Sequence, residues 1–167
     1  EIVEKRKGQV VKTVGDEIMA VFDRPEAASA AARDMQLRVG AMEPVTGVKF
    51  EIRIGFHFGP VLEDKGDFLG ESVNTAARLR SLAKGGQILT SGTTANKLSI
   101  TQRIYLRDQD TVNLQGKRDT MDVYELLSGD TEEATHVAGL ATSANVKATL
   151  TLEIGGRTVS FPEGKPV

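Results

Sequence analysis

Five polar residues carry the side chains from which chemistry could be built in this chain. Asn74 and Arg78 are four residues apart, so on a helix their amide and guanidinium groups share one face. Asp67 supplies a carboxylate just before that segment, while Lys12 and Asp16 supply an ammonium and a second carboxylate around a predicted tight turn. A guanidinium suits phosphate oxygens on which charge develops, and a turn carboxylate can hold a divalent cation. The set suits a ligand with a base edge, a ribose and phosphates, that is, a nucleotide.

Each of these residues also has an ordinary structural explanation. Aspartate is common in tight turns for conformational reasons, and a strand lysine is usually solvated. A carboxylate at the entry to a helix interacts favourably with the helix dipole. An asparagine and an arginine one turn apart can form a surface salt bridge or cap. No residue of the set is specific alone, and their joint order and spacing favour the functional interpretation.

Composition excludes several classes of function. The 167 residues carry a formal net charge of -2, so we expect no binding to nucleic acid. The chain has no cysteine, which rules out a disulfide framework and a thiolate metal site and fits a cytoplasmic location. No stretch approaches eighteen consecutive apolar residues, so we expect no membrane span here. We expect one domain with a real core, and part of another.

The elements that must position the polar residues follow from periodicity and turn residues. Asp23 and Glu26 have the spacing of a capping box, which predicts that Asp23 caps the first long helix. His57 lies on the polar side of a strand and is interpreted as structural rather than catalytic. The order predicts an α+β fold, an α/β sandwich with helices packed on a mainly antiparallel sheet. The predicted elements are a hairpin over 9–22, an alanine-rich helix, a strand over 48–58, a helix over 71–83, a strand over 87–91, a short helix over 93–98, and strands over 112–114 and 122–127.

A change of composition at Gly129 predicts a domain boundary. Residues 129–147 are small, polar and aperiodic, which is typical of a linker. Residues 148–167 alternate again and predict the first hairpin of a second, all-β domain. The chain begins at Glu1 and its first methionine is Met19, so we expect a piece of a longer protein that could be membrane-anchored elsewhere.

Several segments together follow one known pattern, and the block from Asp67 to Arg78 is its most specific part. The chain resembles the catalytic domain of the class III nucleotidyl cyclases, the adenylate and guanylate cyclase family, over residues 1–128. That resemblance implies a ferredoxin-like cyclase fold. The matching segments are residues 12–20, 54–60, 68–79, 86–91 and 123–126.

The resemblance also implies a role for each polar residue. Asp16 resembles a metal-binding aspartate, and Lys12 and Asp67 resemble the pair that recognises the adenine edge. Asn74 resembles the residue that orients the ribose, and Arg78 the one that stabilises the transition state. Lys117, in a Gly-Lys turn, resembles a lysine that contacts the terminal phosphates. The implied reaction converts ATP to 3′,5′-cyclic AMP and pyrophosphate with two Mg²⁺ or Mn²⁺ ions, at sites formed between the two protomers of a homodimer.

The chain departs from the family pattern in its metal site. The first metal aspartate of the family lies in a strand that would precede residue 1, so we expect half of the metal site and a central strand to be missing. We therefore expect residues 1–167 alone to have little or no activity.

Three further interpretations stay open. A guanylate cyclase would carry an acidic residue at position 12 and a small or thiol residue at position 67. A degenerate cyclase-like domain would act as a regulatory or dimerisation module. Residues 149–167 faintly resemble the opening strands of a forkhead-associated domain, which implies a phosphothreonine protein as partner.

Overall fold

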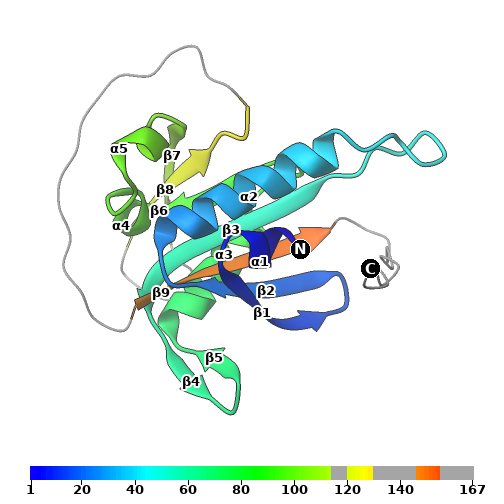
Figure 1. Cartoon of the computed structure of the whole chain (residues 1–167). Helices are drawn as coiled ribbons and strands as arrows, with labels where there is room; N and C mark the ends of the chain where they lie inside the picture. Colours follow the sequence, from blue (N-terminus) through cyan, green and yellow to red (C-terminus); the bar gives the residue numbers. More distant parts are fainter. Residues whose placement is uncertain (114–119, 130–145, 155–167) are drawn as a thin grey trace.

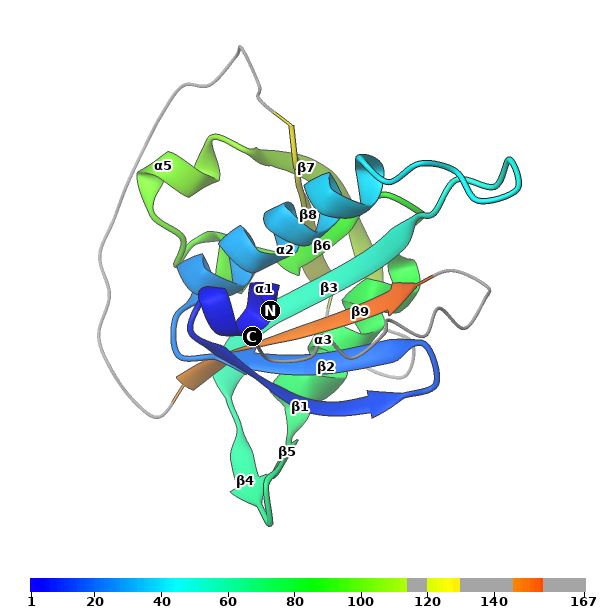
Figure 2. The ribbon, with the colours of Figure 1, turned by 45° about the vertical axis from the view of Figure 1, so that its right-hand side comes forward.

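The computed structural model describes residues 1–113, 120–129 and 146–154. One sheet of seven strands runs through the molecule in the order β1-β2-β9-β3-β6-β8-β7, and a two-stranded hairpin, β4-β5, projects from it (Figures 1 and 2). Every neighbouring pair is antiparallel except β3 and β6, which confirms the predicted α+β fold with a mainly antiparallel sheet. The elements are α1 (Ile2–Lys5), β1 (Gly8–Val14), β2 (Glu17–Phe22), α2 (Pro25–Gly40), β3 (Ile52–Pro60), β4 (Leu62–Asp64), β5 (Asp67–Leu69), α3 (Glu71–Leu82), β6 (Ile88–Ser91), α4 (Gly92–Ala95), α5 (Ile100–Arg103), β7 (Leu106–Asn113), β8 (Thr120–Leu126) and β9 (Val146–Ile154).

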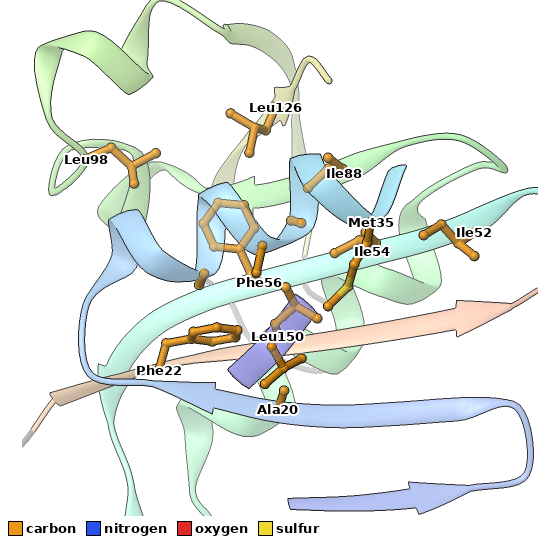
Figure 3. Close-up of a cluster of buried hydrophobic side chains, with 14 residues drawn as sticks. Ala20, Phe22, Met35, Ile52, Ile54, Phe56, Ile88, Leu98, Leu126 and Leu150 are labelled. Atoms are coloured by element: carbon orange, nitrogen blue, oxygen red, sulfur yellow. The ribbon is translucent and has the colours of Figure 1, made fainter. Parts of the chain in front are cut away.

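The two long helices cover opposite faces of the sheet. Small residues of α2, such as Ala28 and Ala32, belong to the main core together with Ile54 and Phe56 of β3. Figure 3 shows part of this core, in which Met35 of α2 lies near Ile54. The next residue position, Gly55, points to the other face, where an added Cβ would lie 2.1 Å from the backbone N of Arg80 in α3. Alternation along β3 therefore assigns α2 to one face and α3 to the other, with α3 pressed against a strand that has no side chain at the contact.

The predicted hairpin and helices are confirmed, with two local corrections. β1 and β2 meet at a two-residue turn in which Gly15 has φ +60°, as predicted. Asp23, however, does not cap α2: Arg24 is the N-cap residue, without a side-chain cap, and Pro25 begins the helix. The carboxylate of Asp23 instead forms an ion pair with Lys147, whose Nζ atom lies 3.3 Å from Asp23 Oδ1.

The second correction concerns Asp67, which was expected beside the entry of a helix. It lies in β5, because Lys65 and Gly66, both with positive φ, make a two-residue hairpin turn between β4 and β5. The strand expected over 48–58 is β3, which begins only at Ile52.

The strand β9 belongs to the main sheet. It begins at Val146, inside the expected linker, and pairs with β2 on one side and β3 on the other (Figure 2). In this structure β9 occupies the position between β2 and β3. Alternation identifies residues 148–154 as a strand but does not say which sheet the strand joins. Residues 130–145 and 155–167, where the rest of the predicted linker and second domain lie, are outside the described residues.

The core is continuous across β9. Leu150 is fully buried beside its register partners Ala20 and Phe56, and Figure 3 shows it between β2 and β3. No helix in the described part of the chain is long and apolar enough to cross a membrane.

Candidate functional site

Lys12 and Asp67, 55 residues apart in sequence, form a direct ion pair. The Nζ atom of Lys12 donates to both carboxylate oxygens of Asp67, at 2.9 and 2.7 Å. The hydrogen bond from Lys12, and a second from the backbone N–H of Phe68, hold the pKa of Asp67 below its usual range. Asp67 is therefore ionised at neutral pH, and both side chains remain half-exposed. The pair presents a donor and an acceptor side by side to an incoming ligand.

A β-bulge in β1 sets the direction of Lys12. Val10 is paired with Ala20, but Lys12 is paired with Met19, so the extra residue Val11 interrupts the regular register. Val11 packs beside Met19 in the small core on the α3 face, and Lys12 opposes Met19. The bulge thus puts consecutive residues on one face, which is the face from which Lys12 reaches Asp67. No sequence signal predicted this bulge.

Asn74 and Arg78 lie on α3 as their spacing predicted. Asn74 is exposed, while the Nη1 atom of Arg78 is shielded from solvent and has no hydrogen-bond partner among the described residues. The nearest carboxylate oxygen in an ion pair with Arg78, from Glu71, is 3.9 Å away, too far for a hydrogen bond. The Nη1 atom of Arg78 therefore keeps unused donor capacity, while 41% of the side chain is exposed, and such a guanidinium can bind an anion that approaches from solvent.

The orientation of α3 depends on two contacts that sequence reasoning missed. Arg80, two residues beyond Arg78, is mostly buried and donates to Glu17 at the start of β2. Gly55 lets the backbone of α3 approach β3 more closely than any side chain would allow. An isolated glycine inside a strand is a recognised signal of close approach, whereas nothing in the sequence links Arg80 to Glu17.

Asp16 occupies the turn between β1 and β2, as predicted, and is partly buried. The described residues contain no group of three or more His, Asp or Glu side chains able to hold a metal ion. Mg²⁺ commonly takes one or two protein carboxylates and completes its shell with substrate phosphates and water. Asp16 therefore fits a ligand for a phosphate-bound ion, not part of a closed metal cage.

His57 is partly buried and belongs to a separate set of polar groups, with the buried residues Ser91 and Thr94. Its Nδ1 atom is 2.7 Å from Ser91 Oγ and 3.3 Å from Thr94 Oγ1. Ser91 caps α4 by accepting from the backbone N–H of Thr94. Burial, and secondarily the charge of Lys97, lower the pKa of His57 to about 4, so its imidazole is neutral at pH 7. These contacts join β3, β6 and α4, which agrees with the structural interpretation of His57.

The structure brings some of the predicted residues together and leaves others apart. Lys12 and Asp67 touch, and Asn74 and Arg78 share a helix. Within the described part of the chain, no hydrogen bond or ion pair joins Asp16 to any of these four residues. Lys117 lies outside the described residues.

Comparisons with known proteins agree with this geometry. A family model described as the adenylate and guanylate cyclase catalytic domain matches residues 1–128. Proteins named adenylate cyclase from Glutamicibacter nicotianae and Streptomyces coelicolor are both 35% identical, over 78% and 61% of this chain. The chain spans only 31% and 26% of the lengths of those relatives.

Solved structures give the same result. An adenylate/guanylate cyclase/hydrolase from Silicibacter pomeroyi is 28% identical, with a TM-score of 0.66, over 75% of this chain and 76% of its own. A rhodopsin-guanylyl cyclase catalytic core with converted specificity, in complex with ATPαS, has the same identity and TM-score, over 75% of this chain and 74% of its own. Adenylate cyclases from Trypanosoma brucei, at 23% identity and a TM-score of 0.68 over 82% of this chain and 76% of theirs, support the fold.

Proposed function

Because this chain belongs to the family of adenylate and guanylate cyclase catalytic domains, we propose that it is an adenylate cyclase domain that makes 3′,5′-cyclic AMP from ATP for intracellular signalling. The Lys12–Asp67 pair is the observation that carries the choice of base. Adenine presents an acceptor at N1 beside a donor at its 6-amino group, which complements an ammonium and a carboxylate. Guanine presents the reverse pattern, a donor at N1 beside an acceptor at O6, so the same pair disfavours it.

In the proposed reaction the 3′-oxygen of ATP forms a bond to the α-phosphorus while the bond from that phosphorus to the pyrophosphate oxygen breaks. The proton of the 3′-hydroxyl is lost, and pyrophosphate carries away the leaving electron pair. Asn74 would orient the ribose, and Arg78 would donate to the oxygens on which charge develops. The unpaired Nη1 of Arg78 supports this role, because a shielded guanidinium nitrogen gains most from an anionic acceptor.

Asp16 would hold divalent metal, Mg²⁺ or Mn²⁺, with two ions per site. Metal ions of this kind activate a hydroxyl group and stabilise charge on phosphate oxygens. We propose a homodimer in which Asp16 serves one site and the other four residues serve its partner site. We also propose that Lys117 contacts the terminal phosphates of ATP. The proposed location is the cytoplasm, where ATP is supplied.

Two alternatives make different predictions for binding. A guanylate cyclase domain would prefer GTP, and some solved relatives are guanylyl cyclases. A degenerate regulatory module would bind neither nucleotide. The names of the curated relatives favour adenylate cyclase, and so does the charge of the Lys12–Asp67 pair.

The test is competition between ATP and GTP for the purified full chain in the presence of Mn²⁺. We expect ATP to bind at least about tenfold more tightly, since one charge-assisted hydrogen bond contributes about 1.5–3 kcal/mol. Replacing Lys12→Glu and Asp67→Cys together should remove that preference while thermal stability is retained. Equal binding of both nucleotides by the unsubstituted chain would refute the base assignment. Robust cyclic AMP production by residues 1–167 alone would refute the expectation that this length is inactive.

A further inference from the structure

The turn that carries Asp16 lies at an exposed end of the sheet. Among the described strands β1 is an edge strand that pairs with β2, and Val14, the register partner of Glu17 across the turn, is 62% exposed. An added Cβ at Gly15 would meet nothing within 4 Å, and Figure 2 shows the turn at the outer end of the hairpin. Such a strand end is held less firmly than strands inside a sheet. A carboxylate that holds a metal ion needs a fixed position, which this turn does not supply by itself.

Arg80 of α3 ties the turn to the body of the domain. Its Nη1 atom donates to the carboxylate of Glu17, the residue that directly follows Asp16. Only 12% of the Arg80 side chain is exposed, although Glu17 stays partly exposed. Solvent and salt therefore screen this ion pair less than they screen a pair at the surface. The contact restrains the first residue of β2, and with it the adjacent turn.

The helix end of this contact is held by close packing. An added Cβ at Gly55 would lie 2.8 Å from the Cα atom of Arg80, so the backbone of α3 lies directly on β3 at this residue. Glu17 belongs to β2, which is two positions from β3 in the sheet, about 10 Å at the usual spacing of strands. The long side chain of Arg80 spans that distance from a closely packed backbone. The position of the turn is thus set relative to α3.

Arg80 and Arg78 have different surroundings on the same helix. Residues two apart do not share a helix face, and the exposed fraction of the side chain is 41% for Arg78 against 12% for Arg80. Arg78 can meet a ligand that approaches from solvent, whereas Arg80 is mostly buried and donates to Glu17. Arg80 therefore acts on the site through the segment that it holds.

We propose that the Arg80–Glu17 pair positions the Asp16 carboxylate for a divalent ion, and thereby sets how much the metal adds to the binding of ATP. This inference rests on the proposed function, in which Asp16 holds Mg²⁺ or Mn²⁺. Lys12, on the other strand of the hairpin, has its own ion pair to Asp67. Loss of the Arg80–Glu17 pair should therefore weaken the metal-dependent part of binding and spare recognition of the base.

ATP titrations of the full chain, with Mn²⁺ and with EDTA, test the proposal. The ratio of the two affinities measures what the metal adds. Arg80→Met should lower this ratio by at least about tenfold, as is usual when a group that orients a metal ligand is removed. The affinity in EDTA should change by less than about twofold. The matched control is Arg107→Met, which breaks another ion pair with one mostly buried partner, Glu125, and should leave the ratio unchanged.

Further variants separate positioning from general stability. The charge swap Glu17→Arg with Arg80→Glu should recover most of the lost ratio, whereas either of these substitutions alone should not. If Arg80→Met does not fold, Glu17→Gln at the partly exposed end of the pair should lower the ratio in the same direction. Amides that join Val14 to Glu17 should exchange at least about tenfold faster in Arg80→Met, while those that join β7 to β8 keep their rates.

The outcomes distinguish failure of the inference from failure of the proposed function. An unchanged ratio in a folded Arg80→Met or Glu17→Gln variant would overturn the inference and leave the proposed function standing. Faster amide exchange with an unchanged ratio would also overturn it, because the pair would then only stabilise the hairpin. If the unsubstituted chain binds ATP neither with Mn²⁺ nor with EDTA, the proposed function fails, and the role of the pair toward the metal fails with it.

Discussion

The molecule holds two sets of polar side chains that differ in what surrounds them. Lys12 of β1 and Asp67 of β5 form an ion pair whose two side chains are 44% and 40% exposed. His57, Ser91 and Thr94 are packed between β3, β6 and α4, and they satisfy one another. Lys12 and Asp67 can therefore exchange their ion pair for bonds to a ligand at little cost to the fold. His57, Ser91 and Thr94 cannot change partners without disturbing the packing of β3, β6 and α4.

The largest expected effect falls on the packed side of this comparison. Gly55→Ala should lower the free energy of unfolding by about 3 kcal/mol, because the new Cβ would lie 2.4 Å from the carbonyl oxygen of Ala76. Gly40→Ala is the control: nothing lies within 4 Å of its added Cβ, and its helical position should tolerate alanine. Urea unfolding of both variants measures the difference. If Gly55→Ala left the free energy of unfolding unchanged, α3 would be able to move away from β3 without loss of stability.

The buried histidine should make stability depend on pH. Its pKa is about 4 in the folded protein against 6.5 when unfolded, so the unfolded chain takes up a proton that the folded chain refuses. Stability is then complete above about pH 6.5 and falls by about 3 kcal/mol as the pH drops to about 4. Unfolding midpoints at pH 7 and pH 4.5 measure the fall. His57→Gln should weaken this dependence of stability on pH. An unchanged dependence in that variant would mean that other groups cause it.

The exposed pair should matter for ligand binding. Lys12→Met should weaken binding of ATP in the presence of Mn²⁺ by at least about tenfold, because a donor to the base is lost and Asp67 is left unpaired. The matched control is Arg6→Met, which breaks an ion pair of the same 2.7 Å length to Asp34 at an equally exposed position. Isothermal titration compares the ATP affinities of the two variants. Equal losses of affinity would contradict a direct contact between Lys12 and the base.

The smallest expected effect is on stability at the same two positions. Lys12→Met and Arg6→Met should each change the free energy of unfolding by about 1 kcal/mol or less, since exposed ion pairs contribute little. Thermal melts of the two variants check this. A large loss for Lys12→Met alone would mean that the pair holds the β4-β5 hairpin in place and that its role is structural.

Residue types and periodicity predicted the fold class because they report directly on which side of an element is buried. The hairpin turn at Gly15 and the helix that carries Asn74 and Arg78 were predicted for this reason, and so were most strands. The position of β9 could not be predicted, because pairing between residues 146–154 and β2 or β3 depends on which edges are free in the folded chain. Alternation is the same for every strand of this kind.

The contact between Lys12 and Asp67 could not be predicted from residue type and spacing, whereas the shared helix of Asn74 and Arg78 could. The placement of these residues depends on contacts between distant segments. Arg80 anchors α3 through Glu17, and the bulge at Val11 directs Lys12 to the right face. Such contacts are decided by three-dimensional packing, and a single sequence has no local pattern that records them.

The bulge in β1 decides which side chains share a face with Lys12. In a regular strand, successive side chains alternate, so only one of two neighbouring residues could lie on the α3 face. Deleting Val11 would restore regular pairing and leave the lysine opposite Met19, but it would remove the apolar side chain that packs there beside Met19. The extra residue thus lets this face carry an apolar contact and an exposed ammonium at consecutive positions.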